Sequence, residues 1–208
     1  VTGNVTISTG VYTADGVIEV IGNLVISSNG SLEVGSQDVK VYTDLSTTTG
    51  GRLKMTNTYG SATVMGSATF AGGAETGLLT AGTLHLERNF TASGTAFTAS
   101  GTHETKFDGN NETTQTIAYS PSAGLGFNHV VFEGYDYKVL AGAPVFLGNV
   151  DILASSSTVS GSVTAKIGGN FTDATLDGVY GGWQVANTNF FGTNKTINSG
   201  FITSNVTV

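Results

Sequence analysis

The chain has 208 residues, with 30 glycines, 2 prolines and no cysteine. Charged residues are 11% of the sequence, under half of the usual quarter, and 39% are hydrophobic, which argues against a disordered chain. The lack of cysteine excludes disulfides and thiolate metal sites. A net charge of −7, with no cluster of lysine or arginine, disfavours nucleic acid as a partner. No apolar run approaches the ~18 residues of a membrane span, so we expect no membrane span.

Short stretches in which apolar and polar residues alternate recur along the chain, whereas amphipathic helical patterns are almost missing. In most of them a charged residue stands between two apolar residues, and the stretches are 18–20, 32–34, 39–41, 53–55, 84–86, 150–152 and 165–167. Successive side chains of a strand point to opposite faces, so this alternation gives one apolar and one wet face. Because glycine, asparagine or serine interrupts nearly every stretch, the sequence predicts an all-β chain of short strands.

A Gly-Asn-hydrophobic phrase recurs, and its asparagines (an arginine replaces the glycine before the third) are Asn4, Asn23, Asn89, Asn149 and Asn170. The successive intervals between these asparagines are interpreted as one, three, three and one coils of a repeat. The pattern predicts a parallel β-solenoid, or β-helix, of about ten coils of ~20 residues, forming a single domain over residues 1–208. We expect the five asparagines to be structural corner residues that point inward and bond neighbouring coils. The alternative is a β-sandwich in which Gly-Asn only marks turns.

Neither end of the sequence has the pattern of a cap. Residues 1–7 begin like a coil and residues 201–208 end like a strand, and both are apolar and nearly uncharged. Open strand edges of this kind favour continuation by further strands. We therefore expect self-association or neighbouring repeats at the ends, with trimming of a longer protein as the alternative explanation.

Two kinds of repeated phrase characterise the sequence: Gly-Asn-hydrophobic-Thr, and Thr-Ala-Ser-Gly at 91–94 and 98–101. In this it resembles repeat regions of large secreted and cell-surface bacterial β-solenoid proteins of the adhesin and filamentous-haemagglutinin-like type. The resemblance covers most of residues 80–175 and the rest more loosely. It implies an extracellular or cell-surface location and a role in adhesion, surface structure or filament building. It transfers no catalytic residue.

Aromatic residues that could stack on sugar rings cluster beside glycines, and they are Tyr135, Tyr137, Tyr180 and Trp183. They suggest a carbohydrate-binding module as the alternative function, although plugging of solenoid corners explains them as well. Rows of threonine within residues 91–102 raise ice binding as a third hypothesis. It is the most distant of the three, because the threonines keep no Thr-x-Thr spacing from coil to coil.

Two further kinds of site are suggested by short motifs. Asp108, Asn110 and Glu112 offer oxygen ligands at the close spacing of a calcium loop, while a plain Asp-Gly turn explains the same residues. Asn29, Asn111, Asn194 and Asn205 lie in Asn-x-Ser/Thr sequons and are candidates for glycosylation. The sequons at Asn4, Asn89 and Asn170 belong to the corner phrases and are expected to be structural.

Catalytic signatures are sparse. The histidines at 85, 103 and 129 lie roughly one coil apart, each with an acid within four residues, and we expect them on a wet strand face rather than around a metal. The sequence has no Gly-x-Ser-x-Gly elbow and no Gly-Lys pair for a phosphate loop. We therefore expect a protein that is not an enzyme and needs no cofactor other than a possible calcium ion.

Overall fold

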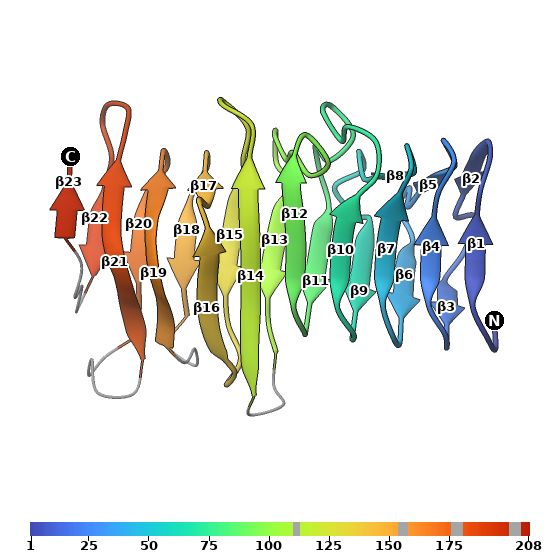
Figure 1. The fold of residues 1–208 in the computed structure, drawn as a ribbon, viewed down its shortest axis with the longest axis horizontal. Helices are drawn as coiled ribbons and strands as arrows, with labels where there is room; N and C mark the ends of the chain where they lie inside the picture. Colours follow the sequence, from blue (N-terminus) through green and yellow to red (C-terminus); the bar gives the residue numbers. More distant parts are fainter. Residues whose placement is uncertain (110–112, 154–157, 176–180, 200–204) are drawn as a thin grey trace.

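The chain winds through three parallel β-sheets that run side by side along one long axis, as the ribbon in Figure 1 shows. The computed structural model describes residues 1–109, 113–153, 158–175, 181–199 and 205–208. Every strand pair in this part of the chain is parallel. The described residues contain no helix long and apolar enough to cross a membrane. The all-β, parallel β-solenoid predicted from the sequence is confirmed.

Each sheet takes one strand from successive coils. Sheet A contains, in spatial order, β1 (Val5–Ile7), β4 (Leu24–Ile26), β7 (Leu45–Thr48), β10 (Ala68–Ala71), β12 (Phe90–Gly94), β14 (Thr114–Pro121), β16 (Tyr137–Gly142), β19 (Thr158–Ile167), β21 (Gly182–Phe190) and β23 (Asn205–Thr207), with β17 (Val145–Phe146) also paired to β19. Sheet C contains β3 (Ile18–Val20), β6 (Asp38–Val41), β9 (Ser61–Val64), β11 (Thr83–Leu86), β13 (Glu104–Phe107), β15 (His129–Phe132), β18 (Val150–Ile152), β20 (Phe171–Asp173) and β22 (Ile197–Ser199). Sheet B contains β2 (Val11–Thr13), β5 (Ser31–Glu33) and β8 (Arg52–Lys54), and isolated bridges such as Met55 to Leu79 extend this third side.

The length of a coil changes along the stack, as the register of sheet A shows. Val5 aligns with Leu24 at the N-terminal end, Phe90 with Ile117 in the middle, and Asn187 with Asn205 at the C-terminal end. The difference in residue number between two such partners is the length of one coil. The coils at the two ends are therefore close to the predicted length, and the coil between β12 and β14 is longer.

The interior of the solenoid is filled by the inward side chains of the strands. Aliphatic residues such as Leu24, Val39 and Leu53 fill the first coils, whereas phenylalanines fill the middle. Phe127 lies at the centre of the aromatic cluster, with ring-centroid distances of 4.5 Å to Tyr119 and 5.3 Å to Phe90. Protein interiors pack without large voids, and in the middle coils aromatic rings fill this space.

Glycines permit the close approach of neighbouring coils at the corners. A Cβ on Gly51 would overlap the carbonyl oxygen of Ile26 in the preceding coil, whereas a Cβ on Gly16 would meet nothing within 4 Å. We expect Gly51→Ala to lower the free energy of unfolding by about 1–3 kcal/mol, because backbone atoms must move to make room. Gly16→Ala, the matched control, is expected to be neutral or to stabilise by up to about 1 kcal/mol. Urea denaturation of both variants checks this, and equal stabilities would contradict it.

Candidate assembly surface at the N-terminal end

The first coil, residues 1–22, presents an unpaired edge on all three sides of the solenoid. Strands β1, β2 and β3 stand at the ends of sheets A, B and C, and within the described residues each pairs on one side only, with β4, β5 and β6. The outer edge therefore carries a row of backbone N–H and C=O groups without strand partners. Such an edge is a template for a further strand.

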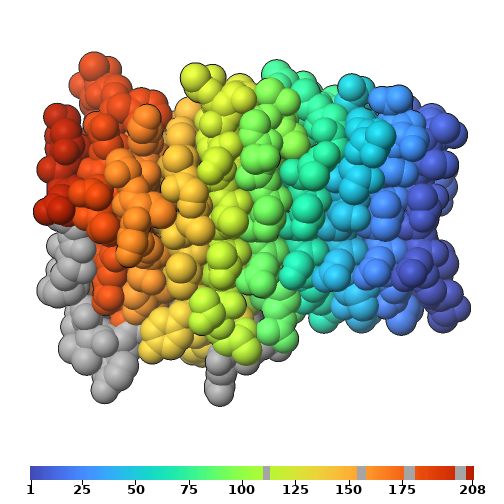
Figure 2. Space-filling model, in the orientation of Figure 1, coloured from blue at the N-terminus to red at the C-terminus, as the bar shows by residue number. Residues whose placement is uncertain are grey.

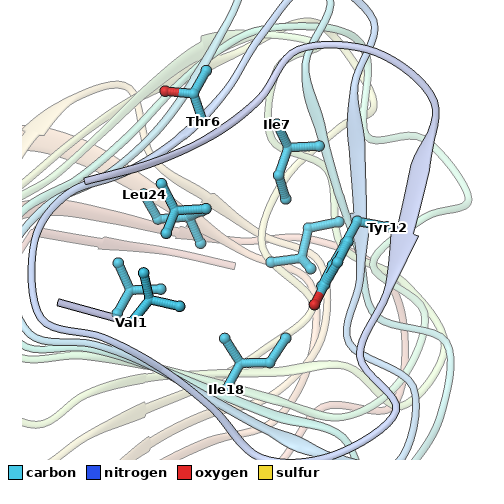
Figure 3. A pocket seen from close by; sticks show the side chains of 9 residues that line it. Val1, Thr6, Ile7, Tyr12, Ile18 and Leu24 are labelled. Atoms are coloured by element: carbon cyan, nitrogen blue, oxygen red, sulfur yellow. The ribbon is translucent and has the colours of Figure 1, made fainter. Parts of the chain in front are cut away.

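Inside this edge the interior of the solenoid opens as an apolar cavity of about 240 Å³, drawn in Figure 3. Its lining residues come from the first two coils and are Val1, Val5, Thr6, Ile7, Tyr12, Ile18, Val20, Leu24 and Leu32. Val20, Leu24 and Leu32 are buried, whereas Tyr12 is 54% exposed and borders the opening. The opening thus offers hydrophobic surface that another coil would bury.

Large exposed hydrophobic side chains concentrate at the two ends of the stack. Of the fourteen in the described part of the chain, eight lie in the first coil or in the last two strands and the residues after them: Val1, Val11, Tyr12, Val17 and Ile21 at one end, and Ile197, Val206 and Val208 at the other. Exposed apolar clusters of this kind mark interaction surfaces. The two end regions therefore carry more of these side chains than the rest of the described chain.

The predicted corner asparagines connect successive coils through their side chains. Asn4 Oδ1 accepts a hydrogen bond from the backbone N–H of Asn23 at 2.9 Å, and Asn23 Oδ1 accepts one from Asp44 at 3.2 Å. At the corner that leads into sheet C, Asn149 Oδ1 accepts a hydrogen bond from the backbone N–H of Asn170 at 3.0 Å. All of these side chains are exposed or half-buried, so the expected inward orientation is wrong: the asparagines lie along the corner and bond the next coil from outside the core.

The same is true of the other members of the set. Asn89 Oδ1 accepts the backbone N–H of Thr116 at 2.8 Å, and Asn170 Oδ1 accepts that of Thr196 at 3.1 Å. However, Asn89 precedes β12 of sheet A and Asn149 precedes β18 of sheet C. The interval between these two asparagines is therefore not three whole coils, because the phrase marks two different corners.

The aromatic residues predicted to bind sugars do not form one platform. Tyr135 and Tyr137 are 68% and 58% exposed, but Trp183 is completely buried. Its Nε1–H donates to Thr188 Oγ1 at 2.7 Å, and its ring lies 5.3 Å from that of Phe171, so it belongs to the core. Tyr180 lies outside the described residues.

The calcium and glycan candidates are only partly described. Asp108 Oδ2 lies 2.9 Å from Nδ1 of His85, and Asn110 and Glu112 lie outside the described residues. No group of three or more acids and histidines able to hold a metal occurs in the described ranges. Of the glycan candidates, Asn29, Asn194 and Asn205 are exposed, Asn29 and Asn194 in left-handed turns, and Asn111 lies outside the described part.

The histidines do not share one wet face. His85 and His129 are half-buried on sheet C, whereas His103 is fully buried with its Nδ1 3.0 Å from the carbonyl oxygen of Ala81. Burial lowers the pKa of His103 to about 4. His103 is therefore a neutral core residue at physiological pH.

Two buried ionisable side chains were not singled out from the sequence. Burial raises the pKa of the Glu75 carboxyl to about 8. The hydrogen bond that this carboxyl accepts from the Leu53 N–H and the positive charge of nearby Arg52 both lower the pKa, but by less. Burial lowers the pKa of Lys138 to about 8, against the raising effect of Asp136 and other acids. The alternation of side chains along β16 is the signal in the sequence that could identify Lys138 as buried, because Lys138 is two residues before the inward-facing Leu140.

Comparison with known proteins gives no relative: no protein-family model, curated protein or solved structure matches this chain.

Proposed function

We propose that this protein is a non-enzymatic structural or adhesive module of the extracellular space or cell surface, whose copies join end to end into a fibre or stalk. The observation that carries the proposal is the first coil, with three unpaired strand edges around an apolar opening. A second copy that stacks its last coil on this surface would pair the free backbone groups and bury the exposed hydrophobic side chains.

The direction of the strands favours head-to-tail stacking. Strands β23 and β22 end sheets A and C at one end of the stack, and β1 and β3 end the same sheets at the other. A copy added head to tail therefore keeps sheet A on sheet A and sheet C on sheet C, with all strands parallel. Such a contact joins two different surfaces and repeats without closing, which produces a filament.

The charges of the two ends are complementary. The only charged side chains in residues 1–22 are those of the acids Asp15 and Glu19. Residues 181–208 contain a single charged side chain, that of Lys195. Asp15 and Glu19 are exposed, as is Lys195. The resulting attraction is modest and screened by salt, so it supports the orientation of the contact more than its strength.

Sedimentation velocity over a wide range of protein concentration tests the proposal. We expect the mass of the wild-type protein to increase with concentration. The double variant Tyr12→Lys, Ile18→Lys places two charges at the apolar opening and is expected to weaken association roughly tenfold or more.

Tyr59→Lys is the matched control, because Tyr59 is 82% exposed and does not line the opening. It should assemble like the wild type. A wild-type protein that stays monomeric at all concentrations, or a double variant that assembles as well as the control, would overturn end-to-end assembly.

A further inference from the structure

A second cavity lies on the flank of the solenoid, between two segments that project from the C-terminal half. One segment, residues 121–124, begins at the last residue of β14, and the other begins at Phe191 after β21. Figure 2 shows both projecting at the upper rim, in yellow and orange-red, with a lower orange surface between them. We call this cavity the saddle groove. Its volume is about 420 Å³, and it is lined by Pro121, Ser122, Ala123, Gly124, Ala143, Val145, Leu147, Lys166, Asn189 and Phe191.

The lining combines an apolar surface with one cation. Val145 and Leu147 are half-buried, and Phe191 leaves 39% of its surface exposed. Lys166 is the sole charged residue among the ten, and in the described part of the chain it takes part in no ion pair. Its ammonium group is therefore available to a ligand.

The fold places hydrogen-bonding groups beside this lysine. Lys166 lies in β19, and parallel pairing aligns it with Asn189 of β21 on one side and with Val145 of β17 on the other. The Lys166 backbone is fixed by a 3.1 Å hydrogen bond from its N–H to the carbonyl of Pro144. An amide and an ammonium group thus come from adjacent strands of one sheet, next to apolar residues.

We infer that the saddle groove binds a small monocarboxylate with an apolar body. Lys166 provides one positive charge, which suits one carboxylate, and the Asn189 amide N–H can donate a second hydrogen bond to it. The apolar body would lie against Phe191, Val145 and Leu147, as in ligand sites that combine a hydrophobic lining with a few polar groups. A polyanion fits less well, because the protein as a whole carries a net charge of −7.

Isothermal titration calorimetry with 4-phenylbutyrate tests this inference, and 4-phenylbutanol is the uncharged control ligand. We expect saturable binding of the acid, with at least roughly tenfold weaker binding of the alcohol, because a charge-assisted contact is lost. Lys166→Met and Phe191→Ala should each weaken binding of the acid several-fold or more, and Lys166→Arg should retain it.

Lys195→Met is the matched control variant, since Lys195 is an exposed lysine that does not line the groove. It should bind the acid like the wild type. Equal binding of acid and alcohol, equal loss in Lys166→Met and Lys195→Met, or tighter Lys166-dependent binding of polygalacturonate than of 4-phenylbutyrate would each overturn the inference.

Discussion

Replacing Phe127 by alanine is expected to lower the free energy of unfolding by about 3–5 kcal/mol. The Phe127 side chain is fully buried, and its ring centroid lies 4.5 Å from that of Tyr119 and 5.2 Å from that of Phe97. Truncation removes these contacts and leaves a cavity, because the surrounding strands are tied to their neighbours on both sides and cannot collapse into it. Urea denaturation followed by circular dichroism measures the loss.

Tryptophan fluorescence gives an independent readout of the same variant. Trp183 is the single tryptophan of the chain, and its ring lies 6.3 Å from Phe146, which stacks on Phe127 at 5.6 Å. The fluorescence transition should therefore shift together with the circular dichroism transition. Tyr59→Ala, at an 82% exposed position, is the control and should change stability by less than about 0.5 kcal/mol. A loss below about 1 kcal/mol in Phe127→Ala would contradict the expectation.

The fold was predictable because two independent patterns agree. Alternation gives the inward face of each strand, and the Gly-Asn phrase gives the length of a coil. The assignment of each phrase to a sheet was not predictable. Asn23 and Asn149 make the same contact, a side-chain oxygen accepting a backbone N–H of the next coil, at corners that lead to different sheets. Identical local chemistry at two corners produces the same sequence phrase.

Burial of individual side chains was predictable only where strand parity is regular. The glycines before Trp183 group it with exposed tyrosines in the sequence, yet its indole N–H donates to Thr188 Oγ1 and the ring is buried. Glu75 follows β10 outside any alternating stretch, so its burial has no signal in the sequence. The saddle groove joins residues from 121 to 191, and such a set is defined by the stacking of coils rather than by a motif.

The stability of the protein is expected to pass through a minimum near pH 8. Three buried groups set this profile: Glu75 with a pKa raised from 4.5 to about 8, His103 with a pKa lowered from 6.5 to about 4, and Lys138 with a pKa lowered from 10.5 to about 8. A group makes the free energy of unfolding depend on pH only between its pKa in the folded protein and its pKa in the unfolded chain. Within that range the free energy of unfolding changes by about 1.4 kcal/mol per pH unit.

Between pH 4.5 and 6.5 the effects of two groups oppose each other. Folded Glu75 keeps a proton that the unfolded chain has lost, so stability falls as the pH rises. Folded His103 lacks a proton that the unfolded chain still binds, so stability rises with pH, and the two slopes cancel. From pH 6.5 to 8 the effect of His103 is complete, and Glu75 should lower the free energy of unfolding by about 2 kcal/mol.

Above pH 8 the slope reverses. Glu75 is then ionised in both states, whereas folded Lys138 is neutral and the unfolded chain keeps this lysine charged up to its ordinary pKa of 10.5. The folded state therefore gains stability as the pH rises toward 10. Urea denaturation at intervals from pH 5 to 10 would trace the minimum.

Glu75→Gln separates this cause from general charge repulsion. In the wild-type protein the Leu53 N–H donates a hydrogen bond to Glu75 Oε1 at 2.9 Å. Glutamine keeps an oxygen that can accept this hydrogen bond, but it cannot ionise. The variant should lose the fall between pH 6.5 and 8, while Lys138→Met should lose the rise above pH 8. Because Glu19 is an exposed carboxylate, Glu19→Gln is the charge-matched control and should keep the wild-type profile. If Glu75→Gln showed the same fall as the wild type, a different group would have to carry it, and the buried carboxyl would not govern stability at neutral pH.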